Sequence, residues 1–97
     1  MSEGDNNRNI KDLLDSFIRR SAFKEGLDAE RVRKAWFRLF DRNIASFTLS
    51  VDYKEGVLKV KLSSAALREE LSRNKKSILD NLNQALGEIL VHEIRFL

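Results

Sequence analysis

The spacing of apolar residues changes near Ile44, and this change restricts the chain to folds that contain both helices and strands. Before Ile44, apolar residues recur three and four positions apart, which is typical of amphipathic helices. Over residues 47–53, and again over residues 57–62, apolar and polar residues alternate as in half-buried strands. The short segment between them contains Gly56, which tolerates the positive φ that tight turns need. The pattern therefore predicts a β-hairpin that follows helical structure.

Two helices are expected before the hairpin. Apolar residues recur at helical spacing over residues 9–23, where Asn9 is a suitable N-cap. Gly26 can adopt the left-handed conformation that ends a helix, and Asp28 can then cap a second helix over residues 29–44. Because the connection is short, the two helices are expected to lie side by side.

One more helix and one more strand are expected after the hairpin. Ser63 or Ser64 can cap a long helix that ends at Gly87, and the alternation in residues 89–97 predicts a third strand. The order is then α-α-β-β-α-β. The expected fold class is α+β, a two-layer domain in which helices pack on a three-stranded sheet.

Composition sets the scale of the domain. The chain has 97 residues, 42% of them apolar, which is enough for one domain with one core. Residues 1–8 are polar and predict a disordered lead-in, so residues 9–97 are taken as the single domain.

Without cysteine, neither a disulfide nor a thiolate metal site can form. Because the chain has neither a hydrophobic leader nor a run of the ~20 apolar residues that span a bilayer, a cytoplasmic protein without membrane contact is expected.

The expected core is centred on Trp36, the only tryptophan. On a helix over residues 29–44 it falls in the apolar sector, so burial is favoured over a binding role. The other residues expected in the core come from the same helix, the hairpin, the long helix and the last strand: Phe40, Leu58, Val60, Leu71 and Ile94.

A basic stripe accompanies this apolar sector. Its members are spaced three, four and four residues apart, and they are Arg31, Lys34, Arg38 and Arg42. Such a stripe can contact successive phosphates, with an affinity that is weak and falls as salt rises. The alternative is a solvated helix face.

A second basic surface is expected on the outer face of the sheet. It consists of Lys59 and Lys61, with Arg95, Thr48 and Ser50.

Phe37 lies outside the apolar sector, next to Arg33, and these two residues are candidates for binding a protein partner. The alternative is that Phe37 packs on a neighbouring element.

His92, the only histidine, is expected to be partly buried beside Ile94 and Phe96. Because no nucleophile, phosphate-loop or metal-ligand motif accompanies it, no enzyme activity, cofactor, metal or small-molecule substrate is expected.

The order of elements resembles that of the DciA-like domains. The resemblance covers roughly residues 9–97, and it depends on Trp36, the run of residues 56–64, Leu67, Glu70-Leu71, Leu82-Asn83, Gly87 and Ile94-Arg95-Phe96. It implies a KH-like fold. Characterised members are bacterial factors that help to load the replicative helicase DnaB and can contact DNA. The four glycines, at positions 4, 26, 56 and 87, do not form the GxxG clamp of nucleic-acid-binding KH modules.

The resemblance therefore implies a non-enzymatic adaptor in bacterial replication initiation, with DnaB as partner and with possible weak DNA contacts. The alternative is a protein-interaction or oligomerising module without a nucleic-acid role, in which a strand edge pairs with a partner.

Overall fold

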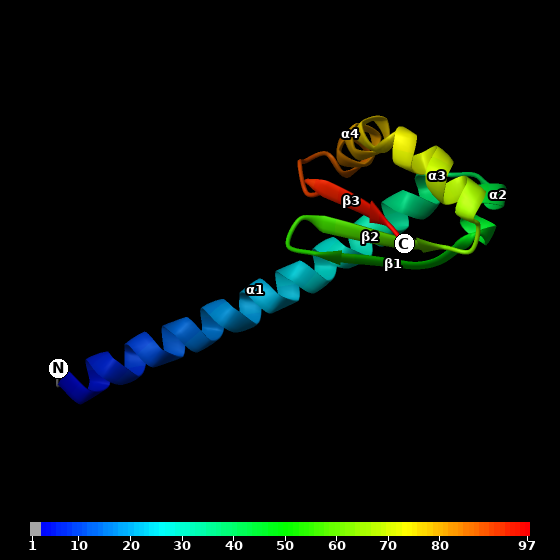
Figure 1. Ribbon diagram of the computed structural model, residues 1–97. Coiled ribbons are helices and arrows are strands. Elements are labelled where there is room, and N and C mark those ends of the chain that lie inside the picture. Colours follow the sequence, from blue (N-terminus) through cyan, green and yellow to red (C-terminus); the bar gives the residue numbers. More distant parts are fainter. Residues whose placement is uncertain (1–2) are drawn as a thin grey trace.

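The computed structural model describes the backbone of residues 3–97 and the side chains of residues 9–97. It is an α+β domain with a long helix that projects from it (Figure 1). In chain order the elements are α1 (Glu3–Leu39), α2 (Arg42–Ser46), β1 (Thr48–Lys54), β2 (Val57–Leu62), α3 (Ala65–Arg73), α4 (Lys75–Leu86) and β3 (Glu93–Phe96).

The sheet has the order β1-β2-β3, with β2 in the centre. The β1–β2 pair is antiparallel and the β2–β3 pair is parallel. The hairpin turn has positive φ at both Glu55 (49°) and Gly56 (82°), as in the two-residue turns that suit the twist of the strands. The backbone amides of His92 and Glu93 donate to the Gly56 carbonyl, so the turn also supports the start of β3.

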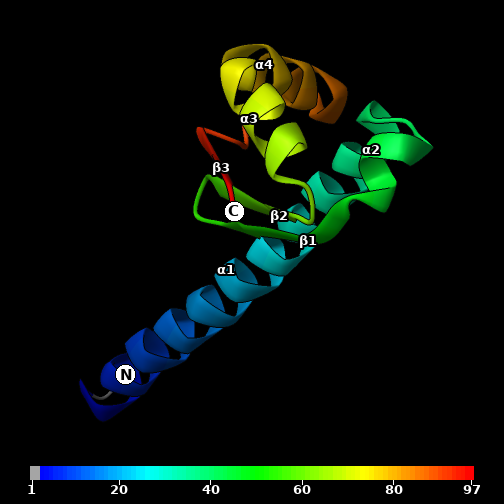
Figure 2. The same ribbon diagram turned by 45° about the vertical axis from the view of Figure 1, so that its right-hand side comes forward.

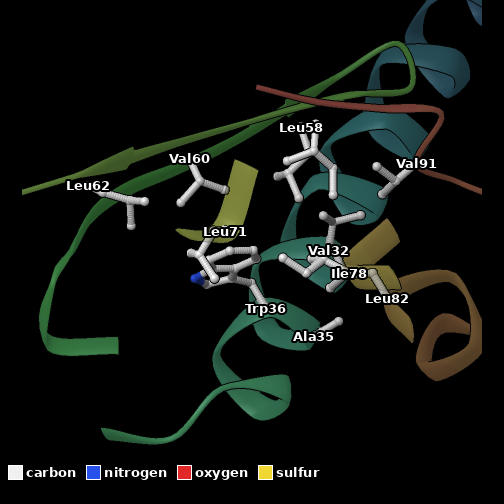
Figure 3. Packing of buried hydrophobic residues seen from close by; sticks show 11 residues of the cluster. Val32, Ala35, Trp36, Leu58, Val60, Leu62, Leu71, Ile78, Leu82 and Val91 are labelled. Carbon is white, nitrogen blue, oxygen red and sulfur yellow. The ribbon is translucent and has the colours of Figure 1, made fainter. Parts of the chain in front are cut away.

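The helices lie on one face of the sheet. Buried residues of α1, α3 and α4 form one cluster with the inward side chains of β2 and β3 (Figure 3). The members buried most deeply are Val32, Trp36, Leu58, Val60, Leu82 and Val91. Leu71 and Ile94 are also buried, and Phe40 packs against the cluster while partly exposed. The sheet and helices thus form two layers around one core.

The expected break at Gly26 is wrong, because α1 continues through it from Glu3 to Leu39. Asp28 does not cap a new helix; its carboxylate instead binds Lys24 and Arg31, one turn before and one turn after it. These pairs stabilise the helix across the expected break. Leu27 is 51% exposed and does not close a helical hairpin. The N-terminal half of α1 therefore projects from the domain instead of folding back (Figure 2).

α1 also begins inside residues 1–8, the stretch that the sequence predicts to be a disordered lead-in. The helix begins at Glu3, while residues 1–2 of this stretch lie outside the described residues.

Two further helix boundaries differ from expectation. The second expected helix, over residues 29–44, instead ends with α1 at Leu39, and Asp41 caps the short α2 by accepting from the Ile44 amide. The single helix expected before Gly87 is divided at Asn74, whose backbone is not helical. The Asn74 side chain donates to the Glu70 carbonyl at 3.0 Å, and such local bonding by asparagine competes with helix continuation.

A bulge between Thr48 and Ser50 changes the face of the residues at the start of β1. Leu49 is the extra residue and is 59% exposed, although simple alternation predicts that it faces the core. Thr48 pairs with buried Leu62 and faces inward, so its expected place on the outer face is wrong. The alternation is regular from Val51 onward.

Candidate functional site

The basic stripe of α1, defined in the structure as Arg31, Lys34 and Arg38, borders a groove between α1 and the end of α4. This groove has a volume of about 270 Å³ and is completed by Ala85 and Leu86. The groove is lined by the three cations and by apolar side chains of both helices. It is too small to enclose a drug-sized ligand, so it is better suited to a contact with a larger partner.

Arg31 is largely committed to holding α1 against α4. Its guanidinium donates to Asp28 at 3.3 Å, to Glu88 at 3.0 Å and to the Leu86 carbonyl at 3.0 Å. The Leu86 carbonyl belongs to the last turn of α4, where the helix dipole favours a cation. The bond to Glu88 is the largest of the effects that raise the Arg31 pKa above its ordinary value. Arg31 therefore has a structural role before any ligand binds.

Lys34 and Arg38 are more available. Both are exposed, and Lys34 Nζ lies 3.9 Å from Glu30 Oε1, a loose contact. Arg33 binds the same Glu30 more closely, and its hydrogen bond is the main reason that the Glu30 pKa lies below its ordinary value. In the described part of the chain Arg38 forms no ion pair.

Arg42 is separated from this stripe, which corrects the expectation that all four cations share one helix. α1 ends at Leu39, and Arg42 begins α2 after the Asp41 cap. The 100° spacing that aligns it with Arg38 on a continuous helix therefore does not apply.

Arg20 and Lys24 lie on the same side of α1 as the basic stripe, and the sequence reasoning missed them. The break expected at Gly26 concealed their helical spacing relative to Arg31. Lys24 binds Asp28 at 2.9 Å, and this bond raises the Lys24 pKa. The cations from Arg20 to Arg38 extend over about 27 Å of helix.

Asp28 is a buried residue that binds two of these cations, Lys24 and Arg31. It is only 7% exposed although it is charged. The hydrogen bond from Lys24, supported by Arg31, holds the pKa of its carboxyl below the ordinary value, although burial alone would raise that pKa. A buried carboxylate between two cations is expected to be ionised at neutral pH.

The outer face of the sheet carries the second group of candidate residues. Lys59 and Lys61 are exposed and alternate with buried Leu58 and Val60. Lys59 and Arg95 line a shallow hollow of about 460 Å³. Arg95 is partly neutralised because its Nε donates to Glu93 at 2.7 Å.

The two groups of cations do not form one surface. Lys34 and Arg38 belong to the helix layer, whereas Lys59 and Lys61 point away from the opposite face of the sheet. The core lies between them (Figure 3). A single straight nucleic-acid strand could therefore follow one group or the other, and the two can be tested separately.

Phe37, the candidate for partner binding, is 39% exposed on α1. Its neighbour Arg33 lies one turn earlier and bonds to Glu30 through both Nε and Nη2 at 3.3 Å. The pair thus places an aromatic ring beside a partly neutralised guanidinium. Aromatic and arginine side chains are the residue types most enriched among energetically dominant interface residues.

His92 is exposed, so the expectation that it is partly buried is wrong. β3 begins one residue later, at Glu93, and His92 therefore does not share the inward face of Ile94 and Phe96. Its ring instead lies over Gly56, where an added Cβ would be 2.7 Å from His92 Cδ2. This close approach is a packing reason for glycine in the turn, in addition to the positive φ.

The described residues contain no cluster of three or more histidine, cysteine, aspartate or glutamate side chains placed to hold a metal. Within the same part of the chain, no helix has the length and apolar character required to cross a membrane.

The model of a family described as "Dna[CI] antecedent, DciA" matches residues 9–96, which is nearly the whole chain. No curated protein and no solved structure matched.

Proposed function

The chain belongs to the DciA family, and we propose that it acts as a non-enzymatic adaptor of the bacterial replicative helicase DnaB. The family match over residues 9–96 carries this proposal. The shifted pKa values have structural causes, which is compatible with a non-enzymatic role. Those of Lys24, Asp28, Glu30 and Arg31 arise chiefly from ion pairs within the fold, and that of Tyr53 arises chiefly from burial.

The helicase contact is assigned to Phe37 and Arg33. Phe37 is a large apolar side chain on α1, a helix held in the domain by completely buried Trp36 at the preceding position. A ring held in this way loses little conformational freedom on binding, which favours affinity. The contact is proposed to place Phe37 in an apolar depression of the partner, with Arg33 at its polar rim.

Replacing Phe37 with serine is expected to weaken binding to the helicase of the same organism about tenfold or more, because a central aromatic contact is lost. Binding is measured by co-purification of the two proteins and then by titration. Phe23→Ser is the matched control, since Phe23 is 70% exposed on the same helix and lies about 21 Å away along it. If the folded chain does not bind the helicase at all, the adaptor proposal is wrong. If both variants bind equally well, the assignment to Phe37 is wrong.

DNA binding is assigned to Lys34 and Arg38 rather than to the whole predicted set. Arg31 is occupied by Asp28 and Glu88, and Arg42 lies on another helix. The two remaining cations are exposed and line one groove. Each phosphate contact would add affinity that does not depend on base sequence and that decreases with salt.

The double substitution Lys34→Gln, Arg38→Gln is expected to lower affinity for single-stranded DNA about tenfold at ~50 mM salt and to reduce the slope of log affinity against log salt by roughly 1.4. The matched control is Lys59→Gln, Lys61→Gln, which removes the same charge from the opposite face. Fluorescence anisotropy across a salt series measures both. A larger loss in the control would move the site to the sheet. Binding too weak to measure in the unmodified chain would exclude a DNA role.

A further inference from the structure

The N-terminal half of α1 carries a continuous apolar stripe. The stripe consists of five large side chains spaced three or four residues apart along one side of the helix, each between 57% and 65% exposed: Ile10, Leu13, Leu14, Phe17 and Ile18. The helix is straight through this region and projects away from the sheet (Figures 1 and 2). The stripe is therefore available along its whole length.

Among the side chains that the structure describes, none covers this stripe. Among residues 9–97, the first α1 side chain that hydrogen-bonds to another element is Glu25, which accepts from the Glu55 amide at 2.7 Å. The five side chains together expose roughly 600 Å² of mostly apolar surface, as much as the largest patches found on typical monomers. A projecting helix also needs packing on its apolar face to be stable in water. Both observations indicate an occupant.

The charges along the helix favour a second copy, in antiparallel orientation. Residues 3–15 contain four acidic and two basic residues, a net charge of −2, whereas residues 16–24 contain three basic residues and no acidic ones, a net charge of +3. Antiparallel pairing places the acidic half of each helix along the basic half of the other. Parallel pairing would bring like charges together, which is unfavourable.

We propose that the apolar stripe of α1 is a self-association surface that pairs with the stripe of a second copy in an antiparallel two-helix arrangement centred near Leu14. Ile10 of each copy then lies close to Ile18 of the other, and the contact has twofold symmetry. Burial of roughly 600 Å² from each chain gives a total near 1,200 Å², the lower limit of stable specific interfaces. The dimer is therefore reversible and depends on concentration. It uses a helix, not a strand edge, and is independent of the proposed helicase contact.

Sedimentation equilibrium of the full chain tests this proposal. The apparent mass is expected to rise above 11.2 kDa as concentration increases from about 1 to about 100 μM. Phe17→Ser should weaken dimerisation about tenfold or more, because it removes a central aromatic contact. Phe23→Ser is the control: this phenylalanine is on the same helix and more exposed, but it lies outside the stripe. Neither residue is in the core, so both variants are expected to fold.

Disulfide trapping tests the orientation, since the chain has no cysteine of its own. Oxidation should join an Ile10→Cys chain to an Ile18→Cys chain. Neither variant should cross-link efficiently alone, because identical positions lie about 12 Å apart along the helices, beyond disulfide reach. Efficient cross-linking of Ile10→Cys with itself would overturn the antiparallel arrangement. A mass of 11.2 kDa at every concentration, an equal effect of Phe23→Ser, or a monomer that sediments with anionic lipid vesicles would overturn self-association.

Discussion

Replacing Trp36 with alanine is expected to lower the free energy of unfolding by about 3–5 kcal/mol, the usual effect of removing a large aromatic side chain from a core. Trp36 is completely buried and packs against two other rings, with centroid distances of 4.3 Å to Phe40 and 6.1 Å to Phe96. Its Nε1–H also donates to Thr48 Oγ1 at 3.2 Å, and the Thr48 hydroxyl donates to the Ile44 carbonyl. Trp36 therefore links α1 directly to the start of β1 and, through Thr48, to α2.

The loss is large relative to the whole domain, since domains of this size are stable by only about 5–15 kcal/mol. Urea unfolding followed by circular dichroism measures it, because the variant lacks the only tryptophan fluorophore. Phe37→Ala is the matched control: it changes the adjacent aromatic residue, which is 39% exposed. We expect the control to cost less than about 1 kcal/mol. Equal costs for the two variants would contradict the role of Trp36 as the centre of the core.

The parts of the fold that the sequence predicted correctly are those set by local patterns. The hairpin follows from alternation on both sides of Glu55-Gly56, and the structure has positive φ at both residues. Gly87 ends α4 in the left-handed conformation with φ of 77°, as expected for a helix C-terminus. Trp36 is buried because the helical period places it among apolar residues. In each case the information lies within a few residues of the feature.

The errors concern features that depend on side-chain partners. Gly26 and Asp28 have the composition of a helix end followed by a cap, yet Asp28 binds Lys24 and Arg31 instead. The sequence offers both uses of this aspartate, and local propensity cannot rank them. The expected helical hairpin was wrong for this reason. Because α1 is continuous instead, an apolar stripe is exposed on its projecting half, and this exposure could not be predicted.

The candidate site shows the same division. Helical spacing correctly groups Arg31, Lys34 and Arg38 along one groove. It cannot show that Arg31 is occupied by Glu88, 57 residues later in the chain, or that the end of α1 removes Arg42. The number of available cations on this surface is therefore a property of the tertiary structure.

The family pattern includes Leu82-Asn83, and the structure gives each residue a physical role. Leu82 is completely buried in the core. Asn83, next to it on α4, directs its side-chain amide to the segment that leads into β3. Its Oδ1 accepts from the Leu90 and Val91 amides at 3.1 and 2.9 Å, and its Nδ2 donates to the Val91 carbonyl at 2.8 Å. This one side chain thus satisfies three backbone groups in a segment without regular structure.

Replacing Asn83 with alanine is therefore expected to destabilise the domain by about 2–4 kcal/mol, because three partly buried backbone groups lose their partner. Asn81→Ala is the matched control, since it makes the same chemical change at an exposed position of α4 and is expected to alter stability by no more than about 0.5 kcal/mol. Urea unfolding measures the global effect. Hydrogen exchange supplies the local one, since the Leu90 and Val91 amides should lose protection before the β1–β2 hairpin does. Unchanged protection of these two amides in Asn83→Ala would show that another group holds the segment. Such a result would mean that the Leu82-Asn83 motif does not determine the position of β3.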